Sequence, residues 1–184
     1  MMNQAIILTD GKAGHENQSK ALARSLGLNY QLLPIQFKSK FHKSLSYLLD
    51  HLGLRTLWVF KFEKTDIKPG TIFIGAGSGT FYGTKAFAQK YLGKCAVILY
   101  PRGYHLPSFD VILAPAFDNP LPAKNVITIP ANLVANDEAF YAEGVKKFWE
   151  VRGLSDLRGQ EYPLSFVRLP ALVPVLRCAF TIHN

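Results

Sequence analysis

Residues 5–19 read AIILTDGKAGHENQS, a stretch that changes character twice. Ala5–Leu8 is a short apolar run, which is typical of a buried strand. Gly11 and Gly14 then bracket a tight loop, and we expect Asn17–Ser19 to open a helix. A strand, a glycine loop and a helix in this order predict the first unit of an α/β domain.

A loop of this kind favours an anion or a polar, sugar-like group. Several backbone N–H groups and the positive end of the helix dipole point toward one place, and Lys12 and His15 would add positive charge and hydrogen bonds. The loop lacks the G-x-x-x-x-G-K-[ST] spacing of a Walker A motif. The alternative is an ordinary strand–helix turn, in which the glycines supply positive φ angles and Asn17 or Ser19 caps the helix.

Strands and helices are predicted to alternate along the chain. A helix is expected at 82–91 and another from residue 137, and short apolar runs predict strands at 30–35, 71–74, 96–99, 109–115 and 125–130. This alternation predicts an open parallel sheet with helices on both faces, a Rossmann-like α/β fold. Ligands of such sheets bind beyond the carboxyl ends of the strands, where Asp10, Gly75, Arg102 and Asp118 are expected.

Residues 75–80, GAGSGT, form a second glycine loop between a predicted strand and a predicted helix. Thr80 stands where the dinucleotide motif G-x-G-x-x-G has its third glycine, and the acidic residue expected about 20 positions later is missing. We therefore predict no dinucleotide cofactor. Close approach of a ligand to the loop backbone and close packing of helix on strand both remain open.

Composition sets the class of protein. The chain has 184 residues, of which 48% are apolar, enough for one domain with a sizeable core. Its two cysteines, Cys95 and Cys178, have no metal-ligand spacing, which favours a reduced, cytoplasmic setting. The first residues do not form a signal peptide, and no apolar run is long enough for a membrane span. The net charge of +8 favours anionic partners.

Residues 37–68 mix lysines with aromatic side chains. Such a pattern can lie on an anionic membrane surface, which would place the protein peripherally at the inner face of a membrane. Binding of nucleic acid, with bases stacked on the aromatic rings, is the least favoured alternative. The remaining interpretation is a core-facing helix and strand with solvated lysines, because leucines at 45, 48, 49 and 52 have helical spacing.

The chain divides into two parts at about residue 150. Residues 1–150 form the predicted Rossmann-like domain. In residues 151–184, prolines and arginines interrupt the apolar stretch, so we expect a linker and the beginning of a further unit.

Several stretches together resemble the mitochondrial-fission (elongated-mitochondria) family of glycosyltransferase-like proteins of bacteria and plants. They lie within residues 5–130 and read TDGKAGHENQS, IFIGAGSGT, YPR, FDVILAPAFD and KNVITIP. The resemblance implies the N-terminal lobe of a two-lobed GT-B-type fold. In such folds the nucleotide sugar binds the C-terminal lobe, and the N-terminal lobe presents the acceptor. Since family members are longer, the resemblance also implies a truncated chain that lacks its donor lobe and is inactive alone.

The resemblance implies a ligand site for a sugar or nucleotide sugar. Asp10 or His15 would act as catalytic base, and Lys12 and Arg102 would hold anionic groups. One departure is Phe117, where the family often has an acidic residue or histidine. The expected ligand-binding residues are Gly11, Lys12, Gly14, Asn17, Gln18, Gly75, Gly77, Ser78, Gly79, Thr80, Arg102, Asp118 and Asn125.

Two further expectations concern metals and the competing function. No metal is expected, because the histidines lack a ligand spacing. The competing function is a non-enzymatic peripheral membrane or protein-recruiting factor that uses residues 37–68.

Overall fold

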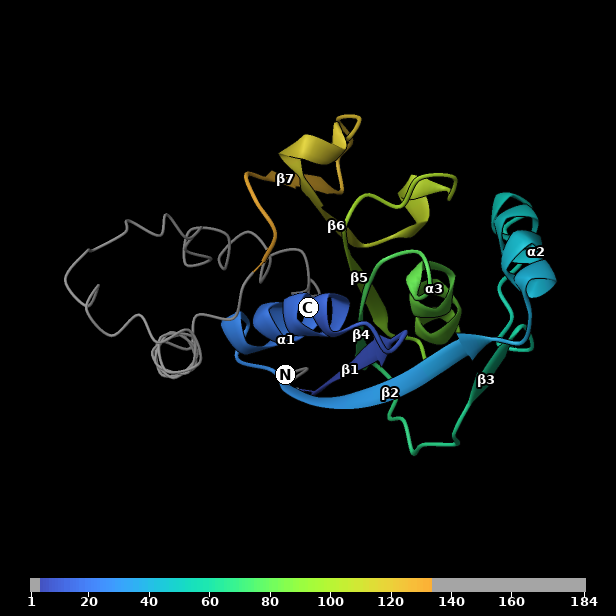
Figure 1. Ribbon diagram of the computed structural model, residues 1–184. Helices are drawn as coiled ribbons and strands as arrows, with labels where there is room; N and C mark the ends of the chain where they lie inside the picture. The colour runs from blue at the N-terminus through green and yellow to red at the C-terminus, as the bar shows by residue number, and fades with distance from the viewer. Residues whose placement is uncertain (1–3, 134–184) are drawn as a thin grey trace, which may run out of the picture.

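The computed structural model describes residues 4–133. Within them the strands form a seven-stranded sheet of order β3-β2-β1-β4-β5-β6-β7 (Figure 1). The strands are β1 (Gln4–Thr9), β2 (Asn29–Phe37), β3 (Phe60–Phe62), β4 (Ile72–Ala76), β5 (Lys94–Ile98), β6 (Val111–Pro115) and β7 (Val126–Ile129). The α-helices are α1 (Ala13–Ser25), α2 (Lys40–His51) and α3 (Phe81–Lys90).

All neighbouring strands are parallel except β2 and β3. The predicted open parallel sheet is therefore confirmed, with an antiparallel edge strand that was not predicted. β2 continues to Phe37, two residues beyond the predicted end at residue 35, and Pro34 lies inside it. β2 pairs with β1 as far as Pro34 and with β3 from Ile35 onward. Proline has no N–H to donate, and here it lies where one partner strand replaces the other.

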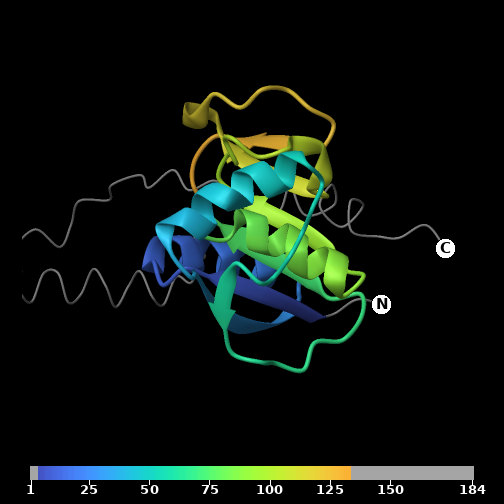
Figure 2. The same ribbon diagram turned by 90° about the vertical axis from the view of Figure 1, so that its right-hand side faces the viewer.

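Helices cover both faces of the sheet, because successive side chains of each strand point to opposite sides. On one face Ala5 and Ile7 belong to a core that includes Leu22 of α1. On the other face Ile6 and Leu8 pack in a core with α3. Figure 2 shows α2 and α3 together in front of the sheet and α1 behind it.

Helix α1 begins at Ala13, four residues before the predicted start. The loop is short because side chains bind its first N–H groups. Gly11 N donates to Thr9 Oγ1 at 3.1 Å, and Lys12 N donates to Asp10 Oδ1 at 3.3 Å. Gly11 has a φ of +81°, which favours glycine. The helix predicted from residue 137 and the boundary predicted at residue 150 lie outside the described residues.

The strand order reverses between β1 and β4. From β1 the chain passes through α1 to β2 on one side, whereas β4 and the strands after it lie on the other side. The loops after β1 and β4 therefore leave neighbouring strands at the same edge of the sheet. In α/β folds this switch point is where ligands bind.

Within residues 4–133 no helix has both the length and the apolar character needed to cross a bilayer.

The thiol of Cys95 tests the packing of the central sheet. Burial, followed by the negative charge of Asp110, raises the pKa of Cys95 to about 12. We expect a Cys178→Ser variant, which keeps Cys95, to react with Ellman's reagent at pH 8 only as fast as it unfolds. Added urea should accelerate the reaction, and rapid stoichiometric labelling of the folded protein would contradict the structure.

Candidate functional site

Asp10 and His15 form a pair at the carboxyl end of β1. Asp10 is the first residue after the strand, and His15 lies in the first turn of α1. His15 Nδ1 is 3.1 Å from each carboxylate oxygen of Asp10. The side chains are 12% and 21% exposed, respectively, so both remain accessible to a ligand. Because a carboxylate can only accept, Nδ1 is the donor, and in a neutral imidazole Nε2 would then carry the lone pair.

Two glycines of the loop after β4 make room for this pair. A Cβ at Gly77, whose φ is +77°, would lie 2.1 Å from His15 Cε1. A Cβ at Gly79 would lie 2.8 Å from the Cβ of Asp10. The second glycine loop therefore packs directly against Asp10 and His15, and any other residue at Gly77 would displace the imidazole.

Lys43 brings a third element to the site. This residue of α2 donates from Nζ to Ser78 Oγ at 2.9 Å. The backbone N–H groups of Ser78 and Gly79 have no acceptor among residues 4–133. Lys12, at the N-terminus of α1, has a side chain that is 69% exposed and lies 3.9 Å from Asp10 Oδ2. The site thus combines free N–H donors with two cations.

Gly75 and Thr80 contribute to the packing of α3 on β4. A Cβ at Gly75 would lie 2.6 Å from Thr80 Oγ1, so this glycine allows α3 to pack closely on β4. Thr80 is fully buried, and its hydroxyl donates to the carbonyls of Ala76 and Gly77. Close packing of helix on strand therefore accounts for both residues.

The remaining residues of the first stretch lie inside α1 instead of in the loop. Gly14 is exposed, and a Cβ there would meet no atom within 4 Å. Asn17 is also exposed. Gln18 is buried, and its Oε1 has no hydrogen-bond partner among the described residues. The loop between β1 and α1 is thus residues 10–12 alone. A helical turn that carries Gly14 and His15 follows it directly.

The residues predicted near the later strands, Arg102, Asp118 and Asn125, form no hydrogen bond or ion pair with Asp10 or His15 among the described residues. Arg102 donates to the carbonyl of Asp118, whose Oδ2 accepts from Tyr100 N at 3.2 Å. These bonds join the loops after β5 and β6. Asn125 precedes β7 and therefore lies at the opposite, amino-terminal edge of the parallel strands. Its Nδ2 donates to the carbonyls of Leu106 and Phe109, at 2.8 and 2.7 Å.

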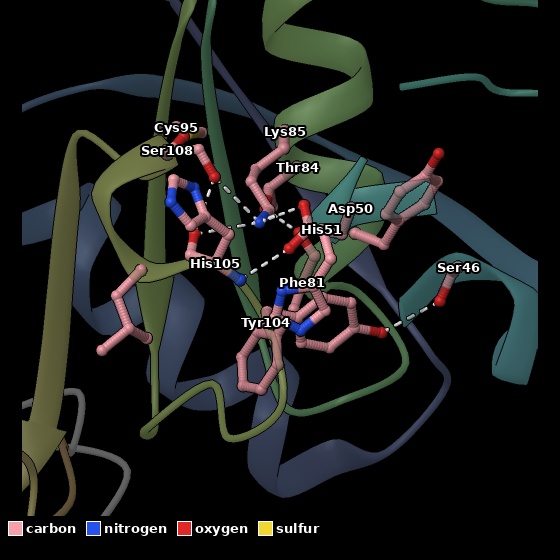
Figure 3. Close-up of polar contacts among 12 residues, drawn as sticks. Ser46, Asp50, His51, Phe81, Thr84, Lys85, Cys95, Tyr104, His105 and Ser108 are labelled. Atoms are coloured by element: carbon pink, nitrogen blue, oxygen red, sulfur yellow. Dashed lines mark hydrogen bonds and ion pairs between the residues drawn. The ribbon is translucent and has the colours of Figure 1, made fainter. Parts of the chain in front are cut away.

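A buried ion pair that the sequence analysis missed supports the site (Figure 3). Lys85 of α3 and Asp50 of α2 have fully buried side chains and form an ion pair. Lys85 Nζ also donates to Ser108 Oγ at 3.0 Å and lies 4.1 Å from the ring centre of Phe109. Asp50 Oδ2 accepts from His105 N at 2.7 Å. The pair therefore joins α2, α3 and the loop that precedes β6.

This pair also determines where Lys43 lies. Lys43 and Asp50 are on the same helix, seven positions or two helical turns apart. Ser46, which lies between them, contributes a 3.1 Å hydrogen bond to Tyr104 Oη. Because these contacts fix α2 against α3, they hold the Lys43 ammonium beside the loop after β4.

A matched pair of glycine variants tests the geometry of the site. We expect Gly77→Ala to lower the free energy of unfolding by about 1–3 kcal/mol, because it combines a left-handed φ with a clash at His15. Gly14→Ala should leave it unchanged or raise it by up to about 1 kcal/mol, because alanine favours helix and meets open space. Urea unfolding measures both values, and equal effects would contradict the contact between Gly77 and His15.

Removal of one charge tests the buried pair. We expect Asp50→Asn to lower the free energy of unfolding by about 3–5 kcal/mol, because Lys85 keeps its charge without a partner. Glu16→Gln, which removes a partly exposed pair with Lys20, is the control and should lower it by about 1 kcal/mol or less. Urea unfolding at pH 7 measures both.

The Asp50→Asn variant should regain part of its lost stability as the pH rises. Burial lowers the pKa of Lys85 below its ordinary value of 10.5, and Asp50 opposes this shift. Without Asp50 the folded chain binds this proton still more weakly than the unfolded chain. Unfolding then takes up a proton below pH 10.5, so the free energy of unfolding rises with pH in that window. The deficit of Asp50→Asn relative to the parent should therefore be smaller at pH 9 than at pH 7, and a larger deficit would contradict this sign.

No group of three metal-ligating side chains occurs within the part of the chain that the structure describes.

A family model described as "Mitochondrial fission ELM1" matches residues 13–150. This span includes His15, Lys43, the loop after β4 and the Lys85–Asp50 pair, and it begins just after Asp10. No curated protein and no solved structure matched the chain. Since the match covers well over half of its length, the chain belongs to the mitochondrial fission ELM1 family.

Proposed function

We propose that this chain binds a sugar- or phosphate-containing ligand where the loops after β1 and β4 meet. The observation that carries the proposal is the contact of the Asp10–His15 pair with Gly77 and Gly79 at the switch point of the sheet. Two strand–loop–helix units converge there, and polar groups remain available in both. This is the position at which open α/β sheets bind ligands.

The available groups are suited to a ligand with negative charge. The free N–H groups of Ser78 and Gly79 can donate to phosphate oxygens, and the N-termini of α1 and α3 add positive potential. Lys12 and Lys43 supply full charges. Asp10 is the acidic group of the site, and its carboxylate is already bound to His15. These features favour a phosphate or diphosphate together with a hydroxyl-bearing group.

The Asp10–His15 pair suits the removal of a proton from a hydroxyl group. Asp10 accepts from Nδ1 and orients the ring, so that Nε2 of His15 can take the proton of an acceptor hydroxyl. Lys12 and Lys43 would stabilise the negative charge of a leaving diphosphate. In the two-lobed form that the family resemblance implies, the nucleotide sugar would come from the second lobe. The proposed activity is therefore that of a glycosyltransferase-like N-terminal lobe.

A ligand panel tests this proposal by thermal unfolding of the full chain. Nucleoside diphosphates, nucleotide sugars and inorganic phosphate are each added to the protein. A ligand at 100 times its dissociation constant stabilises the fold by about 2.7 kcal/mol, which gives a clear rise in Tm. We expect a rise with at least one phosphate-containing ligand and no rise in the variants Asp10→Asn, His15→Ala or Lys43→Ala.

Lys124→Ala is the matched control, because Lys124 is exposed and lies near the opposite edge of the sheet. This variant should keep the full rise in Tm. If the parent and the variants respond equally, the bound ligand lies elsewhere. If the well-folded parent responds to no member of the panel, the proposal is wrong for this chain.

A further inference from the structure

Helix α2 buries two polar side chains and exposes several apolar ones. A helix on the surface of a domain normally buries apolar residues and exposes polar ones. The buried residues of α2 are instead Ser46 and Asp50. Their partners are also polar or charged, namely Tyr104, Lys85 and the His105 N–H. Tyr47 and Leu49 also pack against the core, but the fully buried contacts of this helix are polar or ionic.

The outer face of α2 is an apolar stripe. Phe41, Leu45, Leu48 and Leu52 follow one another at intervals of four, three and four residues. At 3.6 residues per turn they fall within a sector of about 60°, opposite Asp50. Leu45 is partly exposed, whereas the exposed fractions of Phe41, Leu48 and Leu52 are 69%, 58% and 63%. The predicted helical spacing of leucines 45, 48, 49 and 52 is confirmed, but only Leu49 packs against the core, whereas the other three belong to this stripe.

The stripe continues into the segment after α2. The Phe41 and His42 rings are in edge contact, with centres 5.9 Å apart, and the His42 and Trp58 ring centres are 5.0 Å apart. Trp58 and Leu54 are 59% and 55% exposed. The other aromatic side chains predicted for a membrane surface are not available, since Phe60 is buried and Phe37, Tyr47 and Phe62 pack against the core. We call Phe41, Leu45, Leu48, Leu52, Leu54 and Trp58 the α2 face.

Positive charge surrounds the α2 face. Residues 37–62 contain five lysines and arginines and one acidic residue, Asp50. Since Asp50 is buried and paired with Lys85, it does not offset these charges at the surface. Lys40 begins α2, and Lys38 Nζ lies 4.9 Å from the ring centre of Trp58. Apolar and cationic groups are thus presented on one surface.

A hollow beside Trp58 adds a place for an anionic group. It has a volume of about 470 Å³ and is open to solvent, and Arg55, Gln89 and Lys90 also line it. Arg55 Nε is buried without a hydrogen-bond partner, and Arg55 forms no ion pair within residues 4–133. A guanidinium and an ammonium beside an indole ring suit a phosphate group that is joined to an apolar chain.

We propose that the α2 face docks on the surface of an anionic phospholipid bilayer. Phe41, Leu48, Leu52 and Trp58 enter the boundary between headgroups and acyl chains, as the apolar face of an interfacial helix does. Lys38 and Lys40 lie over the anionic headgroups, and the hollow at Arg55 holds a lipid phosphate. The charge of this surface favours lipid over an apolar protein groove, because unpaired lysines gain most beside a dense anionic surface.

Sedimentation of the full chain with vesicles tests the proposal. Vesicles of phosphatidylcholine are compared with vesicles that contain phosphatidylglycerol in addition. We expect binding to the anionic vesicles only, and weaker binding as the salt concentration rises. Phe41→Ser/Leu48→Ser should weaken this binding by roughly tenfold or more, because it removes two inserted side chains. Lys40→Glu changes the charge by two units and should weaken it by roughly 25-fold, at about fivefold for each unit.

Each variant has a matched control outside the α2 face. Leu92→Ser/Leu121→Ser removes two side chains that are at least as exposed, and Lys124→Glu reverses another exposed charge. These controls should bind as the parent does. Asp10→Asn should also bind as the parent does, because docking does not depend on the ligand site. All variants should keep the Tm of the parent, apart from any change at Asp10.

Several results would overturn the proposal. The first is a parent chain that does not sediment with anionic vesicles. The second is equal weakening by the α2-face variants and their controls. A concentration-dependent dimer that Phe41→Ser/Leu48→Ser abolishes, in a chain that binds no vesicles, would assign the α2 face to a second copy instead.

Discussion

The ion pair between Lys85 and Asp50 is the contact on which the arrangement of the helices over one face of the sheet depends. Two charges in a dry interior attract strongly, but their removal from water opposes this gain, so such a pair mainly specifies which segments meet. Here the pair brings together α2, α3 and the loop that carries His105 and Ser108. The aromatic rings of Tyr104 and Phe109 surround the ammonium and complete its environment.

The ligand site and the α2 face are linked through this same pair. The inner side of α2 carries Asp50 toward Lys85 and Lys43 toward Ser78, and the outer side carries Phe41 and Leu48 into solvent. A rigid helix therefore connects the proposed membrane surface with the proposed ligand site. The two proposals are therefore compatible, since one helix contributes Lys43 to the first and Phe41 and Leu48 to the second.

The strands and glycine loops could be predicted because their signals are local. Continuous apolar runs marked β1 and β4. Gly11 and Gly77 lie in the turns that follow these strands, whereas Gly14 lies inside α1. The early start of α1 could not be predicted, since it depends on bonds from Thr9 and Asp10 side chains to the loop N–H groups. The sequence also could not predict that the apolar stripe of α2 faces solvent. Periodicity shows that leucines share a face, but the partner of Asp50 lies far along the chain.

The attachment of α2 through polar contacts has a consequence for evolution. Core residues are constrained because each substitution disturbs the packing of its neighbours. The outer positions of α2, such as Phe41, Leu48 and Leu52, have largely solvent-exposed side chains, so substitutions there leave folding nearly unaffected. Selection can therefore change the binding properties of this surface, including the proposed affinity for membranes, while the fold and the proposed ligand site stay the same. Related chains can thus share one α/β domain and still differ in what the outer side of α2 contacts.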